Sequence, residues 1–155
     1  FVFKIIKTTL RTKIKFFKND IYEKGQRLKL NFGHTFAHAI EMALDKKNKP
    51  DKIRHGEAVG IGILCEIFYA NGKNKEFYLT KKILESYNLP TNISKFINKK
   101  EIKNLKNKIY ANIFLDKKRI NKNPRYINLE GLGKTKMSEM KNFKKIKKTI
   151  KEVIF

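Results

Sequence analysis

The feature that most constrains the fold of this chain is a nearly apolar stretch over residues 55–70. Its apolar residues would lie on several faces of a helix, which predicts a helix buried among other helices. These residues are Ala58, Val59, Ile61, Ile63, Leu64, Ile67 and Phe68. Gly60 and Gly62 lie within the stretch and predict close contact with a neighbouring helix. No run in the chain approaches the roughly 18 apolar residues of a membrane span, so no membrane partner is expected.

Other segments carry apolar residues at intervals of three and four, which predicts further amphipathic helices. The expected helices span residues 1–18, 30–45, 76–87, 93–96, 102–114 and 138–155. In the helix at 76–87, the side chains expected to face the core are Phe77, Leu79, Ile83 and Leu84. Residues 126–137 alternate weakly and contain two glycines, which predicts a short β-hairpin. The predicted fold class is all-α: a single multi-helix bundle over residues 1–155 with a hairpin near 126–137.

Composition favours a globular protein and argues against a specific nucleic-acid partner. Hydrophobic residues make up 41% of the 155 positions, enough to bury a core. The net charge of +23 permits non-specific binding of polyanions. Lysine is scattered along the chain, however, and no nucleic-acid-binding motif is present.

Cys65 is the one cysteine, so we expect a buried thiol and a reduced, cytoplasmic setting. The chain starts with Phe1, which suggests a fragment or a processed product.

All three histidines of the chain lie in two short pieces, residues 27–41 and 55–57. If the first piece is helical from about Leu30, then Asn31, His34 and His38 share one helix face, with Arg27 one turn before it. Gly33 interrupts this polar row. Because glycine costs about 1 kcal/mol in a helix interior, its presence suggests close approach of a ligand or of another backbone. Neutral imidazole is a good zinc ligand, so the histidines of these two pieces are candidate metal ligands.

The histidines, and four further residues considered below, also have a purely structural interpretation. The four are Lys13, Glu23, Lys117 and Lys118. Two histidines four residues apart can lie on a partly exposed helix face. Lys13 can be a solvated lysine, and Glu23 with Arg27 can form an exposed ion pair at helical spacing. Lys117 and Lys118 can be surface lysines like many others in the chain. The clustering of the histidines, together with the polar row and Gly33, favours a site.

Two motifs resemble those of the 3-dehydroquinate synthase family. They are Arg27-x3-Asn31-x2-His34-Thr-Phe-x-His38-Ala-Ile-Glu41 and His55-Gly-Glu-Ala-Val-x-Ile-Gly. The resemblance continues upstream at Lys13, Asp20, Glu23 and Gly25, and downstream at Leu89-Pro90, Asp116-Lys117-Lys118 and Leu132-Gly133-Lys134. It covers nearly the whole chain but only the C-terminal half of that enzyme. Glycerol dehydrogenases and iron-dependent alcohol dehydrogenases share the two-histidine arrangement, with different sequences around it. Ala37 stands where the family usually has Gly.

The resemblance implies the metal- and substrate-binding half of an NAD-dependent lyase of the shikimate pathway. The implied substrate is 3-deoxy-arabino-heptulosonate 7-phosphate, a sugar-acid phosphate. In the family, a hydroxyl is oxidised, phosphate leaves by β-elimination, the ketone is reduced, and the opened ring recloses to 3-dehydroquinate. The implied cofactors are NAD and a divalent metal, zinc or cobalt. NAD would be bound mainly by an N-terminal domain that this chain lacks, so the isolated chain is expected to be inactive. That domain is an expected partner, and relatives are commonly dimers.

Site roles are carried over residue by residue from the resemblance. His34 and His55 would hold the metal, while His38 and Glu23 would serve in proton transfer. The implied substrate-binding residues are Lys13, Arg27, Asn31, His34, His38, His55, Lys117 and Lys118. The third metal ligand in the family is a glutamate in an upstream Glu-x-x-Lys segment, and no such segment precedes Lys13. Three alternatives stay open: a related cyclase, a non-catalytic remnant, and a basic nucleic-acid-binding module.

Overall fold

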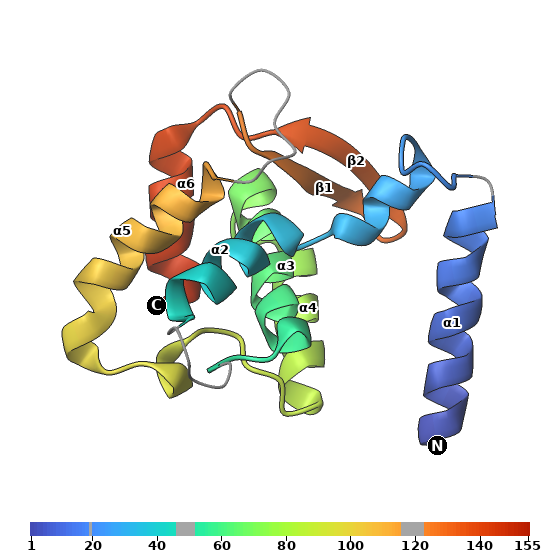
Figure 1. Cartoon of the computed structure of the whole chain (residues 1–155), viewed down its shortest axis with the longest axis horizontal. Helices are drawn as coiled ribbons and strands as arrows, with labels where there is room; N and C mark the ends of the chain where they lie inside the picture. The colour runs from blue at the N-terminus through green and yellow to red at the C-terminus, as the bar shows by residue number, and fades with distance from the viewer. Residues whose placement is uncertain (19, 46–51, 116–122) are drawn as a thin grey trace. The chain divides into compact units, whose positions relative to one another are not determined.

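A computed structural model describes residues 1–18, 20–45, 52–115 and 123–155 of the chain (Figure 1). The chain divides into two compact units, Phe1–Asn31 and Phe32–Phe155, and each is described by itself. None of the helices within the described ranges is both long enough and apolar enough to cross a lipid bilayer.

The first unit consists of helix α1 (Val2–Lys18) and the 3-10 helix η1 (Gln26–Asn31). The Asp20 side chain organises the turn between them by accepting hydrogen bonds from the backbone N–H groups of Lys24, Gly25 and Arg27. The hydrogen bond from the Lys24 N–H is the main reason why the pKa of Asp20 lies below its usual value. No residue of α1 is buried, although its apolar residues have the predicted amphipathic spacing.

Within the described ranges, the second unit contains the remaining helices and one β-hairpin. Its α-helices are α2 (His34–Leu44), α3 (His55–Asn71), α4 (Lys75–Ser86), α5 (Ile102–Ile113) and α6 (Phe143–Thr149). Short 3-10 turns, η2 (Ser94–Phe96) and η3 (Lys99–Glu101), precede α5, and a π-helical turn, η4 (Ile150–Ile154), follows α6. Strands β1 (Arg125–Gly131) and β2 (Lys134–Glu139) pair antiparallel. The predicted helical fold with a hairpin near 126–137 is confirmed.

Helix α3 is the centre of the second unit, as its apolar sequence predicted. It contacts α2, α4, α6, η4 and strand β1, and α2 packs in turn against α5 (Figure 1). The largest fully buried side chains come from several of these elements and include Phe36, Ile40, Ile61, Leu64, Ile67, Ile109, Ile127 and Ile146. Cys65 is fully buried in this core, and burial raises the pKa of its thiol.

Helices α2 and α3 approach so closely that two glycines meet between them. A methyl group at Gly62 would lie 2.0 Å from the carbonyl oxygen of Gly33. One at Gly33 would lie 2.7 Å from both the N atom of Ile63 and the O atom of Val59. Gly33 also has a φ of +84°, in the left-handed region that favours glycine. Of the two explanations offered for Gly33, close approach of another backbone is the one that the structure shows.

The same glycine corrects the helix predicted over 30–45. Because Gly33 is left-handed, the α-helix starts only at His34, and Asn31 lies in the separate turn η1. The helix spacing that placed Asn31 on one face with the histidines therefore does not apply, whereas the spacing of His34 and His38 does. A second correction concerns α4, where Phe77 and Leu84 are buried as predicted but Leu79 and Ile83 are exposed.

The helix predicted from residue 138 begins later than expected. Strand β2 continues to Glu139, and α6 starts after Asn142, whose side chain accepts a hydrogen bond from the Lys145 N–H. Pairing across the hairpin extends from Arg125 opposite Glu139 to Gly131 opposite Lys134. Residues 138 and 139 therefore belong to the strand, although the apolar pattern had assigned them to the helix.

Candidate metal site

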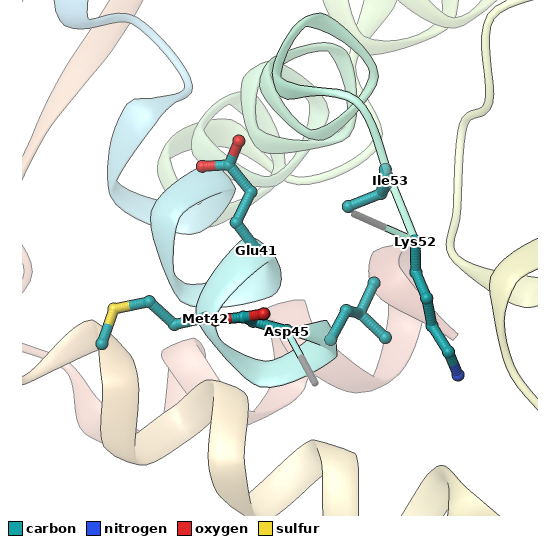
Figure 2. Close-up of a pocket in the computed structure, with 6 residues that line it drawn as sticks. Glu41, Met42, Asp45, Lys52 and Ile53 are labelled. Carbon is teal, nitrogen blue, oxygen red and sulfur yellow. The ribbon is translucent and has the colours of Figure 1, made fainter. Parts of the chain in front are cut away.

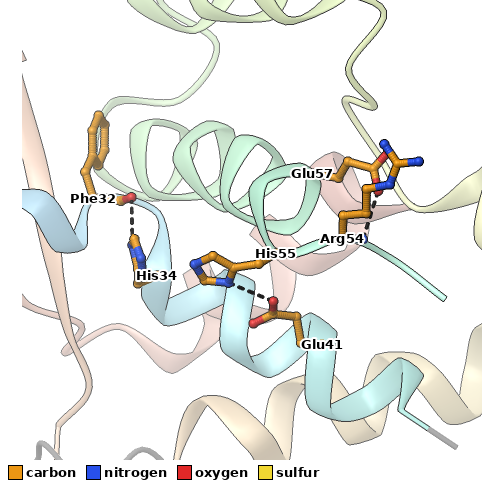
Figure 3. Close-up of polar contacts among 6 residues, drawn as sticks. All are labelled: Phe32, His34, Glu41, Arg54, His55 and Glu57. Atoms are coloured by element: carbon orange, nitrogen blue, oxygen red, sulfur yellow. Dashed lines mark hydrogen bonds and ion pairs between the residues drawn. The ribbon is translucent and has the colours of Figure 1, made fainter. Parts of the chain in front are cut away.

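The structure brings three imidazole rings together at one end of the α2–α3 pair. His34 starts α2, His38 lies one turn further on, and His55 starts α3. The centroids of the His34 and His55 rings are 5.3 Å apart, and those of His34 and His38 are 5.5 Å apart. The His38 and His55 rings are 6.2 Å apart and nearly parallel. Figure 3 shows His55 extending from the start of α3 across α2 toward His34.

Hydrogen bonds define the tautomers of His34 and His55. The Nδ1 atom of His55 lies 2.8 Å from Oε1 of Glu41, and that of His34 lies 3.3 Å from the carbonyl oxygen of Phe32 (Figure 3). A carbonyl and a carboxylate can only accept, so each Nδ1 carries the proton. In a neutral ring the lone pair then lies on Nε2, as metal binding through that nitrogen requires.

The helix ends that carry these histidines are held by specific contacts. The Glu57 carboxylate accepts the backbone N–H of Arg54 at 2.9 Å and so caps the start of α3 (Figure 3). The Thr35 hydroxyl donates to the carbonyl of Arg125 at 2.6 Å, which ties the first turn of α2 to β1. The His34 and His55 side chains therefore project from fixed backbone rather than from loops.

Four other predicted site residues belong to the first unit. There the Asn31 amide donates to the Glu23 carboxylate, and Glu23 has a φ of +54°. The Arg27 guanidinium lies 3.7 Å from the centroid of the Phe17 ring, and the Lys13 ammonium lies 6.0 Å from it. The roles assigned to these residues stay predictions. Lys117 and Lys118 lie outside the described residues.

Comparison with known proteins shows to which family the chain belongs. A family model described as "3-dehydroquinate synthase C-terminal" matches residues 1–119. The chain belongs to this family. Three proteins named 3-dehydroquinate synthase are similar over most of the chain. That of Sulfurimonas denitrificans is 39% identical over 117 residues, 73% of this chain and 30% of the relative. Those of Clostridium botulinum and Chlorobaculum parvum are 38% and 34% identical over 84% and 76% of this chain, covering 35% and 33% of each relative.

The chain thus spans about a third of the length of these 3-dehydroquinate synthases and corresponds to their C-terminal part. Because the matched model reaches only to residue 119, the hairpin and α6 lie beyond it. The histidines, η1 and α1 all lie within it.

The imidazoles of His34 and His55 are suitable ligands for the divalent metal that membership of the 3-dehydroquinate synthase family implies. Two imidazoles bound tetrahedrally through Nε2, with metal–nitrogen distances of about 2.0–2.1 Å, would have ring centroids about 5 Å apart. The observed His34–His55 separation of 5.3 Å agrees with this. Within the described part of the chain, no three His, Cys, Asp or Glu side chains are arranged to hold a metal ion. We therefore consider a site in which the metal is bound by the two imidazoles of His34 and His55 and by a further ligand that is not among these side chains.

Glu66 is a buried acid near this site that the sequence interpretation missed. It is fully buried, and its Oε2 accepts the backbone N–H of Ile127 at 2.9 Å. The N–H groups of Gly33 and Thr35, beside His34, lie close enough to lower its pKa, although Oε1 has no hydrogen bond of normal length among the described residues. Burial outweighs these contacts and raises the pKa of Glu66 to about 8. An acid in the interior of an apolar helix was the available signal.

The buried Glu66 should make the free energy of unfolding depend on pH. Its pKa in the folded state is about 8, above the ordinary value of 4.5 for a glutamate, so the folded state binds the proton more tightly. The associated stability is fully present below about pH 4.5 and is lost as pH rises toward 8. Glu66→Gln keeps an acceptor for Ile127 without a titrating group. Relative to the variant, the wild type should lose on the order of a few kcal/mol between pH 5 and 8 in denaturant unfolding. Parallel pH profiles of the two proteins would contradict the assignment.

Proposed function

We propose that this chain is the metal- and substrate-binding part of a 3-dehydroquinate synthase. The complete enzyme would convert 3-deoxy-arabino-heptulosonate 7-phosphate to 3-dehydroquinate and phosphate, with NAD and a divalent metal. One observation carries the proposal: in a member of this family, the rings of His34 and His55 meet with both Nδ1 atoms hydrogen-bonded to oxygen. Such outer hydrogen bonds are typical of histidines that bind metals.

The residues of the second unit would have distinct tasks. His34 and His55 would hold the metal through Nε2, which leaves positions for a third ligand and the substrate. When bound, the metal would polarise a substrate oxygen. Zinc and cobalt both accept imidazole ligands, and the two histidines do not discriminate between them.

His38 would act on the substrate rather than bind the metal. It lies one turn after His34 on α2, is exposed, and has its ring 6.2 Å from that of His55. An exposed imidazole beside the metal ligands can donate or accept a proton of the substrate.

The cations and the remaining polar groups would recognise the two acidic ends of the substrate. Arg27, Lys13 and one of Lys117 and Lys118 would neutralise its carboxylate and phosphate, since guanidinium and ammonium groups form strong charge-assisted hydrogen bonds with these anions. Asn31 would hydrogen-bond the substrate, with Glu23 as a second proton acceptor. These assignments rest on the family motif.

NAD would be bound by the part of a 3-dehydroquinate synthase that lies outside the matched third. A chimaera therefore tests the proposal: the C-terminal third of the Sulfurimonas denitrificans 3-dehydroquinate synthase is replaced by this chain. With NAD, cobalt or zinc and the heptulosonate phosphate, the chimaera should release inorganic phosphate. His55→Ala in the chimaera should lower the rate about 100-fold or more, because a metal ligand is lost.

The isolated chain serves as the matched control in the same assay and should release no phosphate. Turnover by the isolated chain would contradict the proposed division of labour. A chimaera that folds, binds NAD and metal, and still releases no phosphate would contradict the proposed reaction.

A further inference from the structure

We infer that Glu41 is a positioning residue that sets the orientation and the tautomer of His55 for metal binding. The observation is the 2.8 Å contact between Oε1 of Glu41 on α2 and Nδ1 of His55 on α3 (Figure 3). The inference rests on the proposed function, because it assigns Glu41 a part in the same metal site.

The geometry of α2 places Glu41 where this contact can form. His34, His38 and Glu41 lie at positions i, i+4 and i+7 of one α-helix, which puts all three side chains on one face. His55 reaches this face from the neighbouring helix. Helix α2 thus carries one metal ligand in its first turn and, two turns later, the carboxylate that holds the other ligand.

The contact affects His55 mainly by fixing the orientation and tautomer of its ring, and less by electrostatic attraction. The side chains of His55 and Glu41 are 58% and 27% exposed, so water screens their electrostatic attraction. A hydrogen bond still keeps the proton on Nδ1 and limits rotation of the ring. In water the neutral imidazole prefers its proton on Nε2, and that tautomer offers Nδ1 to a metal instead. Glu41 opposes that preference.

A nearby carboxylate gives the experiment a matched control. Asp45 is the C-cap residue of α2, four positions after Glu41, and both residues border a pocket of about 280 Å³ (Figure 2). Glu41 extends toward α3 in this view, as its bond to His55 requires. Asp45→Asn removes the same negative charge from the same pocket. It therefore separates general attraction of a cation from the specific contact with His55.

The test compares the wild-type chain with Glu41→Ala, Glu41→Gln and Asp45→Asn in two measurements. Cobalt affinity is measured by competition with a chelator. The proton position on the His55 ring is read from its ¹⁵N chemical shifts in metal-free protein at pH 8. We expect Glu41→Ala to weaken cobalt binding about 10- to 100-fold, as loss of an outer hydrogen bond to a ligand does. Glu41→Gln, which keeps an acceptor oxygen, should recover most of the loss, and Asp45→Asn should match the wild type.

The ¹⁵N shifts should show the Nδ1–H tautomer of His55 in the wild type and Asp45→Asn, and the Nε2–H tautomer in Glu41→Ala. Wild-type cobalt affinity in Glu41→Ala, or an unchanged tautomer, would overturn the inference and leave the proposed function intact. A loss in Glu41→Gln equal to that in Glu41→Ala would also overturn it, because Glu41 would then act as a direct ligand. Failure of the wild type to bind cobalt would overturn both the inference and the metal site. Circular dichroism checks that each variant is folded.

Discussion

His34→Ala and His55→Ala should each weaken cobalt binding by about 100-fold or more. Either substitution removes one of the two imidazoles that the structure brings to a centroid separation of 5.3 Å. Loss of an outer hydrogen bond to a ligand costs 10- to 100-fold in metal affinity, and loss of the ligand itself should cost at least as much. Titration of the chain with cobalt, followed by its visible absorption, measures the effect.

His38→Ala is the matched control for this prediction. His38 comes from the same cluster, and its ring is 5.5 Å from that of His34. It is nevertheless assigned to proton transfer, so its removal should change cobalt affinity only a few-fold. Equal losses in all three variants would show that His38 is a ligand. No loss in any of them would place bound cobalt elsewhere.

Gly62→Ala should abolish stable folding of the second unit. The new methyl group would lie 2.0 Å from the carbonyl oxygen of Gly33 and 3.1 Å from the N atom of Ala37. All of these atoms are backbone, so only separation of α2 from α3 can relieve the clash. Overpacking of a core usually costs 1–3 kcal/mol, and a clash with fixed backbone should cost more, a large part of a total stability of about 5–15 kcal/mol. Thermal unfolding followed by circular dichroism measures the loss.

Gly56→Ala provides the comparison on the same helix. A methyl group there meets no atom within 4 Å, although Gly56 lies between His55 and Glu57. Since alanine is favoured over glycine in a helix by about 1 kcal/mol, this variant should melt at the wild-type temperature or slightly above. If Gly62→Ala melted like Gly56→Ala, the close approach of the two helices would be wrong.

The sequence predicted most of this fold because its strongest signals are local. The apolar residues of α3 lie on every face of one helix, and that alone required a bundle around it. The same helix ends at Asn71, close to the end of the apolar stretch, with Gly72 as its C-cap. The hairpin was recognised from weak alternation and two glycines. Each of these patterns is contained within a few consecutive residues.

The errors came from contacts between residues distant in sequence. Gly33 was interpreted as lying inside a helix, but it breaks the helix because α3 passes within contact distance of its backbone. Glu66 was counted with an apolar helix, and its partner, the N–H of Ile127, lies 61 positions away. The motif at 34–41 included Glu41, but its contact with His55 exists only once α2 and α3 are packed together.

The short distance between His34 and His55 results from the packing of α2 against α3, and the roles of the first-unit residues still depend on the family motif alone. For the central claim, that one divalent metal joins His34 and His55, the most direct measurement is zinc anomalous scattering from crystals of the chain grown with zinc. We expect one zinc peak about 2.0–2.1 Å from Nε2 of both His34 and His55. A peak bound to only one of them, or zinc found only on other side chains, would contradict it.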